Sequence, residues 1–291
     1  MFRLGAGRCT HVMTNNTAHQ LLILVTGGTG KTGSRVATRL AQAGHSVRVG
    51  SRTAPIPFSW EDRGTWAAAL ADVHVVYVAY QPDLAVPGAP ETLQAFTVAA
   101  KLAGVRTLVL LSGRGEPEAV ECEEIVRESG LDWTIVRCSF FAQNFSEGAF
   151  TDLVIAGEVA LPNGNVPEPF VHADDIADVA VLALTEDGHH GELYELTGPR
   201  ALTFAEAVGE IAEVTGREIA FIPVSRTEFV AALTDFQLPA DAVSLLDYLF
   251  GTILDGRNSK TADGVQRALG RAPKDFTEYV QETAATGVWN G

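Results

Sequence analysis

The chain has 291 residues, 46% hydrophobic and 20% charged, which is the composition of a globular protein with a sizeable core and not of a disordered one. Its formal net charge of −15 opposes contact with phosphate backbones and excludes direct nucleic-acid binding, and no apolar run approaches the ~20 residues that span a membrane. The three cysteines, Cys9, Cys122 and Cys138, are scattered, so we expect no metal site, no disulfide framework and a cytoplasmic location.

The first twenty residues are polar, lack periodicity and contain no apolar stretch long enough for a signal peptide. We expect residues 1–19 to be a disordered extension, with Met13 as an alternative to Met1 for the natural start. The first predicted strand begins directly after this segment.

That strand, over residues 21–25, leads into a glycine-rich turn, and helix-forming residues follow up to residue 43. Gly27, Gly30 and Gly33 give the spacing G-x-x-G-x-x-G. Glycine is needed where a backbone turns sharply or touches a phosphate without a Cβ in the way. The start of the following helix offers unpaired N–H groups and a partial positive charge. The stretch therefore predicts the phosphate-binding turn of a dinucleotide fold.

Two other interpretations of this turn stay open. The tripeptide Gly30-Lys31-Thr32 matches the end of a P-loop, although Val25 stands where a P-loop requires its first glycine. The turn could also bind no ligand, since a glycine motif by itself is weak evidence.

The end of the second predicted strand, over residues 46–49, indicates which dinucleotide is bound. An NAD-binding fold places an acidic residue about 20 residues past the turn, where it binds the ribose 2′-hydroxyl. This chain has Ser51 and Arg52 there and no acid nearby. A hydroxyl and a guanidinium suit a 2′-phosphate, so NADP(H) is favoured. The alternative is that Arg52 is a solvated loop residue.

Strands and helices continue to alternate up to about residue 144. We expect an extended segment over 55–60, helices over 63–71, 91–103 and 116–128, and strands over 73–80, 107–111 and from residue 134. In the helix over 116–128, Val120 and Ile125 are predicted to face inward and the acidic residues outward. Alternation of this kind predicts an α/β fold, a Rossmann-like doubly wound parallel sheet.

Ligands of such sheets bind beyond the carboxyl ends of the strands. We therefore expect the residues at the strand ends to line one crevice: Thr26, Ser51, Tyr80, Ser112 and Ser139. The segment over 20–144 would then be a dinucleotide-binding core.

From about residue 145 the pattern changes to a smaller, mostly helical substrate lobe over 145–291, part of which returns to the core sheet. Strands are expected over 168–172, 191–197 and 218–223, and helices over 150–157, 174–184, from 203 and from 226 onward. Asp174 or Asp175 would cap the second of these helices, and Thr203 with Glu206 forms a capping box for the third.

Over residues 20–288 the chain resembles the NmrA-like group of atypical short-chain dehydrogenases. The segments that carry the resemblance are VTGGTGKTG, the basic strand end at Arg52, SGLDWTIVRCSFFAQNF, VHADDIADVAVLAL and ELTGPRALTFAEAV. The last segment, RALGRAPKDFTEYVQETAATGVW, is most similar to a branch of ergot-alkaloid clavine dehydrogenases of the festuclavine and agroclavine type.

The resemblance implies a set of cofactor contacts. The residues that would hold the pyrophosphate are Gly27, Thr29, Gly30, Lys31, Thr32 and Gly33. Ser51 and Arg52 would hold the 2′-phosphate, and Ser59 and Trp60 would contact the adenine. The ribose and nicotinamide would be bordered by Ala79, Tyr80, Ser112 and a loop that runs from Ser139 to Asn144, in which Phe140 and Phe141 face the substrate pocket.

One departure from the superfamily bears on the chemistry. Short-chain dehydrogenases typically carry Tyr-x-x-x-Lys, whose tyrosine gives a proton to a carbonyl, and this chain has no such pair. Ser112 lies where the superfamily places its active-site serine, and it could equally be a backbone or cofactor contact. No catalytic residue is therefore assigned.

Without that donor, an acceptor that needs little protonation is favoured. A ketone needs a proton donor, an iminium ion does not, and a quinone needs less help. Tyr80, Phe140 and Phe141 would suit a flat or cationic small molecule. We expect an NADPH-dependent reductase of an iminium, quinone or similar conjugated acceptor, acting as a monomer or homodimer. The alternative is a non-catalytic NADP-binding redox sensor that regulates a partner protein.

Overall fold

The structure is a computed structural model that describes residues 21–148 and 150–290. The extension predicted over residues 1–19 and the two candidate starts lie outside the described residues. Within the described ranges, no helix is long and apolar enough to cross a membrane.

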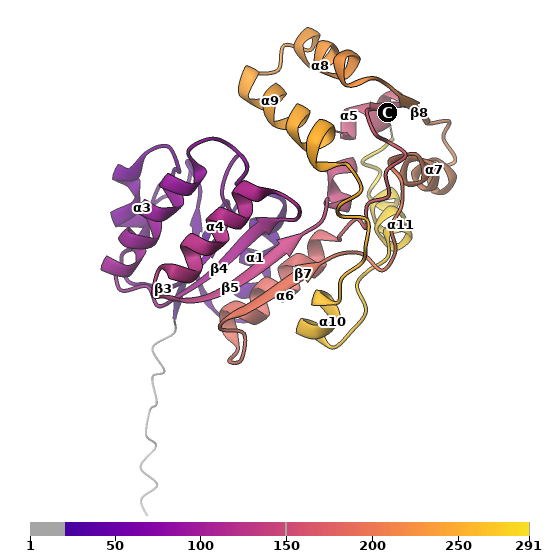
Figure 1. Cartoon of the computed structure of the whole chain (residues 1–291). Coiled ribbons are helices and arrows are strands. Elements are labelled where there is room, and N and C mark those ends of the chain that lie inside the picture. The colour runs from indigo at the N-terminus through magenta and orange to yellow at the C-terminus, as the bar shows by residue number, and fades with distance from the viewer. Residues whose placement is uncertain (1–20, 149, 291) are drawn as a thin grey trace, which may run out of the picture.

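Six parallel strands form the main sheet, in the order β2-β1-β3-β4-β5-β7 (Figure 1). Their bounds are β1 (Leu22–Thr26), β2 (Ser46–Gly50), β3 (Val73–Val78), β4 (Thr107–Gly113), β5 (Asp132–Cys138) and β7 (Glu192–Leu196). Because strand order reverses between β1 and β3, a crevice is expected at their carboxyl ends. This is the predicted Rossmann-like doubly wound sheet, and β7 adds a strand from the second half of the chain.

Helices cover both faces of this sheet, as alternating strand side chains require. One face packs against α1 (Lys31–Gln42), α6 (Ala173–Thr185) and α10 (Gly264–Leu269). The other face packs against α2 (Trp66–Leu70), which follows the short 3₁₀ turn η1 (Arg63–Thr65), and against α3 (Ala89–Leu102) and α4 (Pro117–Glu128). Along β3, for example, Tyr77 enters the first core while Val76 and Val78 enter the second.

The rest of the chain builds a lobe with a third, phenylalanine-rich core. Its elements are η2 (Ala142–Phe145), α5 (Thr151–Ala156), β6 (Glu158–Leu161), α7 (Phe204–Thr215), β8 (Ala220–Pro223), α8 (Arg226–Asp235), α9 (Ala240–Tyr248), η3 (Leu249–Ile253) and α11 (Phe276–Thr286). Figure 1 shows α8 and α9, in orange, at the top of the view, above the strands of the main sheet. The short strand β6, which was not predicted, pairs in parallel with β8. The capping box of Thr203 and Glu206 is confirmed at the start of α7.

Two predictions about helices are wrong. Ile125 is partly buried against the second core, as predicted, but Val120 is 40% exposed, and the buried face of α4 contains Ala119, Cys122, Glu123 and Val126. The prediction assumed that every acidic side chain points to solvent, but Glu123 is buried because an arginine pairs with it.

The second error concerns the N-terminus of α6. His172, and neither Asp174 nor Asp175, is its cap, because His172 Nδ1 accepts a hydrogen bond from the Asp174 N–H at 3.0 Å. The preceding stretch 168–172 is not a continuous strand and contributes only single bridges, Glu168 to Leu202 and Phe141 to Val171.

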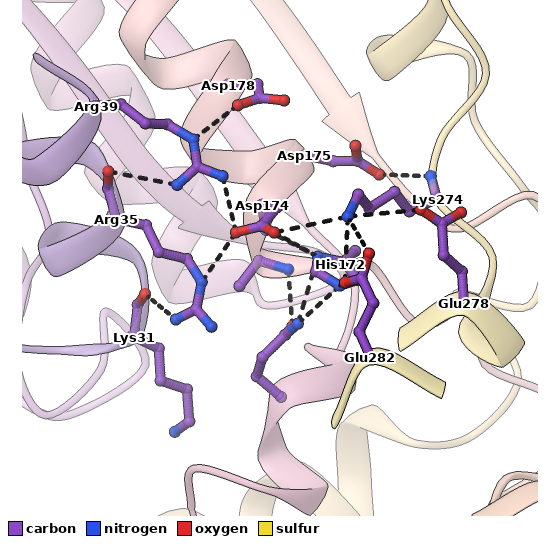
Figure 2. Close-up of polar contacts among 12 residues, drawn as sticks. Lys31, Arg35, Arg39, His172, Asp174, Asp175, Asp178, Lys274, Glu278 and Glu282 are labelled. Atoms are coloured by element: carbon purple, nitrogen blue, oxygen red, sulfur yellow. Dashed lines mark hydrogen bonds and ion pairs between the residues drawn. The ribbon is translucent and has the colours of Figure 1, made fainter. Parts of the chain in front are cut away.

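An ionic network holds α1 against α6 and α11 (Figure 2). Arg35 Nε on α1 lies 3.1 Å from Asp174 Oδ1 on α6, and Arg39 Nε lies 2.8 Å from Asp178 Oδ1. Lys274 Nζ, just before α11, lies 2.9 Å from Glu282 Oε1 and 3.7 Å from Asp174 Oδ2. The network therefore fixes the helix that begins at the glycine turn relative to the C-terminal segment.

Candidate cofactor and substrate site

A cavity of about 370 Å³ opens at the carboxyl edge of the main sheet, between the sheet and the lobe. The residues of the predicted site that line it are Gly27, Gly30, Lys31, Thr32, Ala79, Tyr80, Ser112, Ser139, Phe140, Phe141 and Asn144. The lobe closes the cavity with Leu246 of α9 and with Leu249 and Phe250 of η3. One cavity thus joins the glycine turn to the ends of three strands.

The prediction that all five strand ends line one crevice holds for Tyr80, Ser112 and Ser139 only. Thr26 is fully buried, and its hydroxyl accepts from the Ala79 N–H at 2.9 Å and donates to the Tyr77 carbonyl at 3.0 Å. It therefore ties β1 to β3. Ser51 lies outside the cavity lining, beyond the end of β2.

The glycine turn is built for close backbone approach. Gly27 has φ +59°, a left-handed conformation that favours glycine. A Cβ on Gly33 would lie under 3.0 Å from the Gly27 backbone, so only glycine lets α1 pack against the turn. Helix α1 begins with no side-chain cap and no acidic residue in its first turn. Its unpaired N–H groups and positive end suit a pyrophosphate, which is the fit that the glycine spacing predicted.

Lys31 adds a positive charge to this part of the cavity. It is the first residue of α1 and lines the cavity, and burial lowers the pKa of its ammonium group. The negative charge of Glu147 opposes this lowering, but Glu147 accepts a hydrogen bond from the Arg35 guanidinium at 2.9 Å. Within the described ranges Lys31 forms no ion pair of its own. A partly desolvated lysine of this kind would hold a phosphate group strongly.

Arg52 lies beyond the end of β2, where the 2′-phosphate of NADP would be expected. It is exposed, and its guanidinium makes no hydrogen bond or ion pair with the described parts of the chain. The loop that carries it is closed by the Phe58 N–H, which donates to the Ser51 carbonyl at 2.9 Å. The arginine is therefore an available cation on an anchored loop.

Ser59 and Trp60, predicted to contact adenine, lie outside the cavity lining. Trp60 is buried, its indole N–H donates to the Ala79 carbonyl at 3.1 Å, and its ring lies 4.9 Å from that of Tyr80. It supports the Tyr80 wall of the cavity from behind. Ser59 is half-buried, and its hydroxyl accepts from the Glu61 N–H at 3.2 Å. Thr29 is exposed at the tip of the glycine turn.

The hydroxyl of Ser112 is bonded to a residue that sequence reasoning missed. It donates to Glu123 Oε1 at 2.6 Å, and the same carboxylate receives both Nε and Nη2 of Arg137 on β5. Glu123 is fully buried. The sequence feature that could have predicted this pair is a basic residue inside the apolar strand β5, which requires an acidic partner such as one on α4. Ser112 is thus held by α4 at the edge of the cavity.

Two carboxyl groups that line the cavity were also missed as site residues. Glu116, just before α4, is buried, and its pKa is raised to about 9 by burial and by the neighbouring Asp83. Glu116 Oε2 has no hydrogen-bond donor within the described ranges, and a proton shared with Asp83 would satisfy it. Glu168 is 2% exposed, and burial raises its pKa to about 7. Motif spacing marks neither residue, since their environments are made by distant segments.

Replacing Glu116 with glutamine should make stability less dependent on pH. The folded protein keeps the Glu116 proton up to about pH 9, whereas an ordinary glutamate releases it near 4.5, so wild-type stability falls as pH rises between these values. Glutamine has no such proton, so E116Q should gain up to about 1.4 kcal/mol per pH unit relative to wild type. Urea unfolding at several pH values measures this gain, and parallel curves for the two proteins would contradict it.

Residues 27–187 match the NAD(P)H-binding protein family. The chain is also 33% identical to an oxidoreductase of Bacillus subtilis, YesF, over 92% of this chain and 97% of that protein. The chain belongs to the NAD(P)H-binding, NmrA-like group of atypical short-chain dehydrogenases. This is a family of NAD(P)H-dependent oxidoreductases, so the resemblance inferred from the sequence is confirmed at the level of the family.

Other members of the group are similar along nearly their full length. An NAD(P)H azoreductase of Xenophilus azovorans is 31% identical over 91% of this chain and 98% of its own. An agroclavine dehydrogenase of Claviceps fusiformis is 29% identical over 92% of this chain and 99% of its own.

Among solved structures, the fold is shared with a Citrobacter triphenylmethane reductase complexed with NADP(H), at a TM-score of 0.71 and 21% identity, over 90% of this chain and 99% of the other. It is also shared with an NADPH-dependent quinone oxidoreductase of Escherichia coli, at 0.70 and 20%, with the same coverage.

Proposed function

We propose that this NmrA-like protein is an NADPH-dependent reductase of flat, conjugated small molecules, with azo, quinone, cationic dye or iminium groups as the acceptors. The observation that carries the proposal is the cavity itself. It connects the glycine turn to a wall that contains Tyr80, Phe140 and Phe141, and the sequence has no Tyr-x-x-x-Lys pair. Aromatic walls suit flat or cationic molecules.

The similarity to an azoreductase and to an agroclavine dehydrogenase supports this range of acceptors. The two proteins whose solved structures share the fold are a triphenylmethane reductase and a quinone oxidoreductase. Reduced nicotinamide, when bound, supplies a hydride. The protein's part is to hold the pyrophosphate at Gly30 and Lys31, orient the acceptor against Phe140 and exclude water with the apolar residues of α9 and η3.

A preference for NADPH over NADH is expected to depend on Arg52. The Arg52→Ala variant should bind NADPH more weakly by about 1–3 kcal/mol, because a charge-assisted contact to the 2′-phosphate is lost. NADH lacks that phosphate, so its affinity should change little and it serves as the internal control. Equal losses for both nucleotides would contradict a specific 2′-phosphate contact.

The proposed activity is tested by following NADPH oxidation with an azo dye, a quinone, a cationic triphenylmethane dye and a preformed iminium ion. Turnover of any of these supports the reductase. Tight NADPH binding with no turnover of any acceptor would instead favour the redox sensor. A protein that binds no nucleotide would contradict both functions.

A further inference from the structure

The chain has no Tyr-x-x-x-Lys pair, and burial raises the pKa of Tyr80 in the cavity wall, so a different group is needed to protonate an acceptor that becomes an anion on accepting a hydride. Ser112 is engaged by Glu123, and the guanidinium of Arg114 donates to Glu195 Oε1 at 2.6 Å and to the Asn258 carbonyl at 2.6 Å. Neither is available as an acid. Three carboxyl groups line the cavity, Asp83, Glu116 and Glu168, of which Asp83 and Glu116 interact with each other.

Glu168 is the best placed of the three. Its backbone is fixed by two hydrogen bonds with Leu202, at 2.8 and 3.0 Å. Its side chain reaches the cavity beside Ser139 and Phe140, in the loop expected to cover the nicotinamide. Oε1 receives the Phe140 N–H at a long 3.4 Å. A carboxyl that is 2% exposed and has so weak a donor is poorly stabilised as an anion.

The groups that face Glu168 keep it near the point of half-protonation. Burial raises its pKa, while the Phe140 N–H, the positive charge of Arg114 and the Ser139 hydroxyl lower it, leaving a pKa of about 7. Arg114 acts weakly because its own charge is paired with Glu195 on β7. A general acid is most effective when its pKa lies close to the working pH.

We propose that Glu168 donates the proton that completes reduction of acceptors which become anionic on hydride addition. This inference rests on the proposed reductase function. A neutral azo compound that gains a hydride at one nitrogen becomes an anion at the other, and the Glu168 carboxylic acid protonates that nitrogen to give the hydrazine. NADPH supplies one hydride, which carries both electrons of the reduction, Glu168 supplies one proton, and the carboxylate is reprotonated from water.

The need for Glu168 should differ between two classes of acceptor. A cationic triphenylmethane dye or an iminium ion becomes neutral on accepting a hydride, so it needs no proton at that step. An azo compound cannot finish without one. The role of Glu168 should therefore depend on the acceptor, whereas a residue that only supports the structure would affect every acceptor alike.

The test compares wild type with E168Q, which keeps the shape of the side chain and removes its acidity. With an azo dye, kcat should fall about 100-fold. With a cationic triphenylmethane dye, it should change only a few-fold. In wild type, kcat for the azo dye should fall as pH rises through about 7, since only the protonated acid donates. E168Q should lose this inflection, while E116Q should keep it.

Two readouts do not depend on turnover. NADPH binding to E168Q, followed by fluorescence, should match wild type within a few-fold. Infrared spectra of wild type should show a buried protonated carboxyl that titrates near pH 7 and is missing from E168Q. If E168Q does not fold, a wild-type protein with no carboxyl titrating in this range overturns the proposal.

Other outcomes are equally decisive. Equal losses on the azo and the cationic dye would assign Glu168 a structural role and overturn the proton transfer, while leaving the reductase function intact. Unchanged azo reduction by E168Q would also overturn the proton transfer and leave the reductase function intact. Failure of wild type to oxidise NADPH with any acceptor would overturn the proposed function first, and this inference with it.

Discussion

Replacing Glu123 with alanine is expected to lower the free energy of unfolding by about 3–5 kcal/mol. Glu123 is fully buried, and its carboxylate accepts hydrogen bonds from Ser112 Oγ at 2.6 Å and Arg137 Nε at 2.8 Å. Among the residues that the structure describes, removing it leaves the half-buried guanidinium of Arg137 with one ion-pair partner, Glu195 Oε2 at 3.7 Å. Breaking one side of a buried pair is costly because the remaining charge stays desolvated.

Urea unfolding measures this change, and the adjacent Glu124→Ala variant is the control. Glu124 is exposed, and its one ion pair within the described residues is with Arg127 at 2.8 Å on the same helix, so its loss should change stability by less than about 0.5 kcal/mol. Similar small effects for both variants would contradict a structural role for the buried pair. Ser112 lines the cavity, so the Glu123 variant should also leave the Ser112 hydroxyl without its hydrogen-bond acceptor at that strand end.

Replacing Gly33 with alanine is expected to remove most of the affinity for NADPH. The new Cβ would lie under 3.0 Å from the backbone of Gly27 and Gly28, so the turn and α1 must separate. Overpacking of this kind costs about 1–3 kcal/mol of stability. Displacing the turn should also remove about two hydrogen bonds to the charged pyrophosphate, which weakens NADPH binding roughly 100-fold.

Gly209→Ala is the matched control for this variant. Gly209 also lies in a helix, α7, but a Cβ there meets nothing within 4 Å. Alanine is the better helix former, so this variant should be more stable by about 0.5–1 kcal/mol and bind NADPH as wild type does. NADPH titration and thermal unfolding of both variants compare the two effects. Intact nucleotide binding by the Gly33 variant would contradict a tight glycine turn.

Local patterns in the sequence account for most of the core. The β-branched strand 73–80 corresponds to β3 (Val73–Val78), and the glycine spacing marks a turn that has the backbone geometry of a phosphate site. The capping box at Thr203 also follows from four adjacent residues. These features depend on backbone conformations and side chains that lie within one turn or one strand, so the linear order of residues is enough to predict them.

Features that depend on partners far along the chain were predicted poorly. The apolar and acidic residues of helix α4 are compatible with more than one choice of buried face. Glu123 is buried because it forms an ion pair with Arg137 on β5. His172 caps α6 in place of an aspartate, in a network that includes Lys274 and Glu282 from the C-terminal segment (Figure 2).

The sequence by itself therefore determined the doubly wound sheet, the glycine-rich turn after β1, the basic residue beyond β2 and membership of the NmrA-like family. Only the tertiary structure decided which acidic residues are surface groups and which are site groups. Glu168 becomes a weaker acid because segments far apart in the chain pack around it and leave it 2% exposed, and this burial outweighs the opposing effects of the Phe140 N–H and Arg114. Desolvation is set by the packing of all neighbouring segments, and no spacing along one segment encodes it.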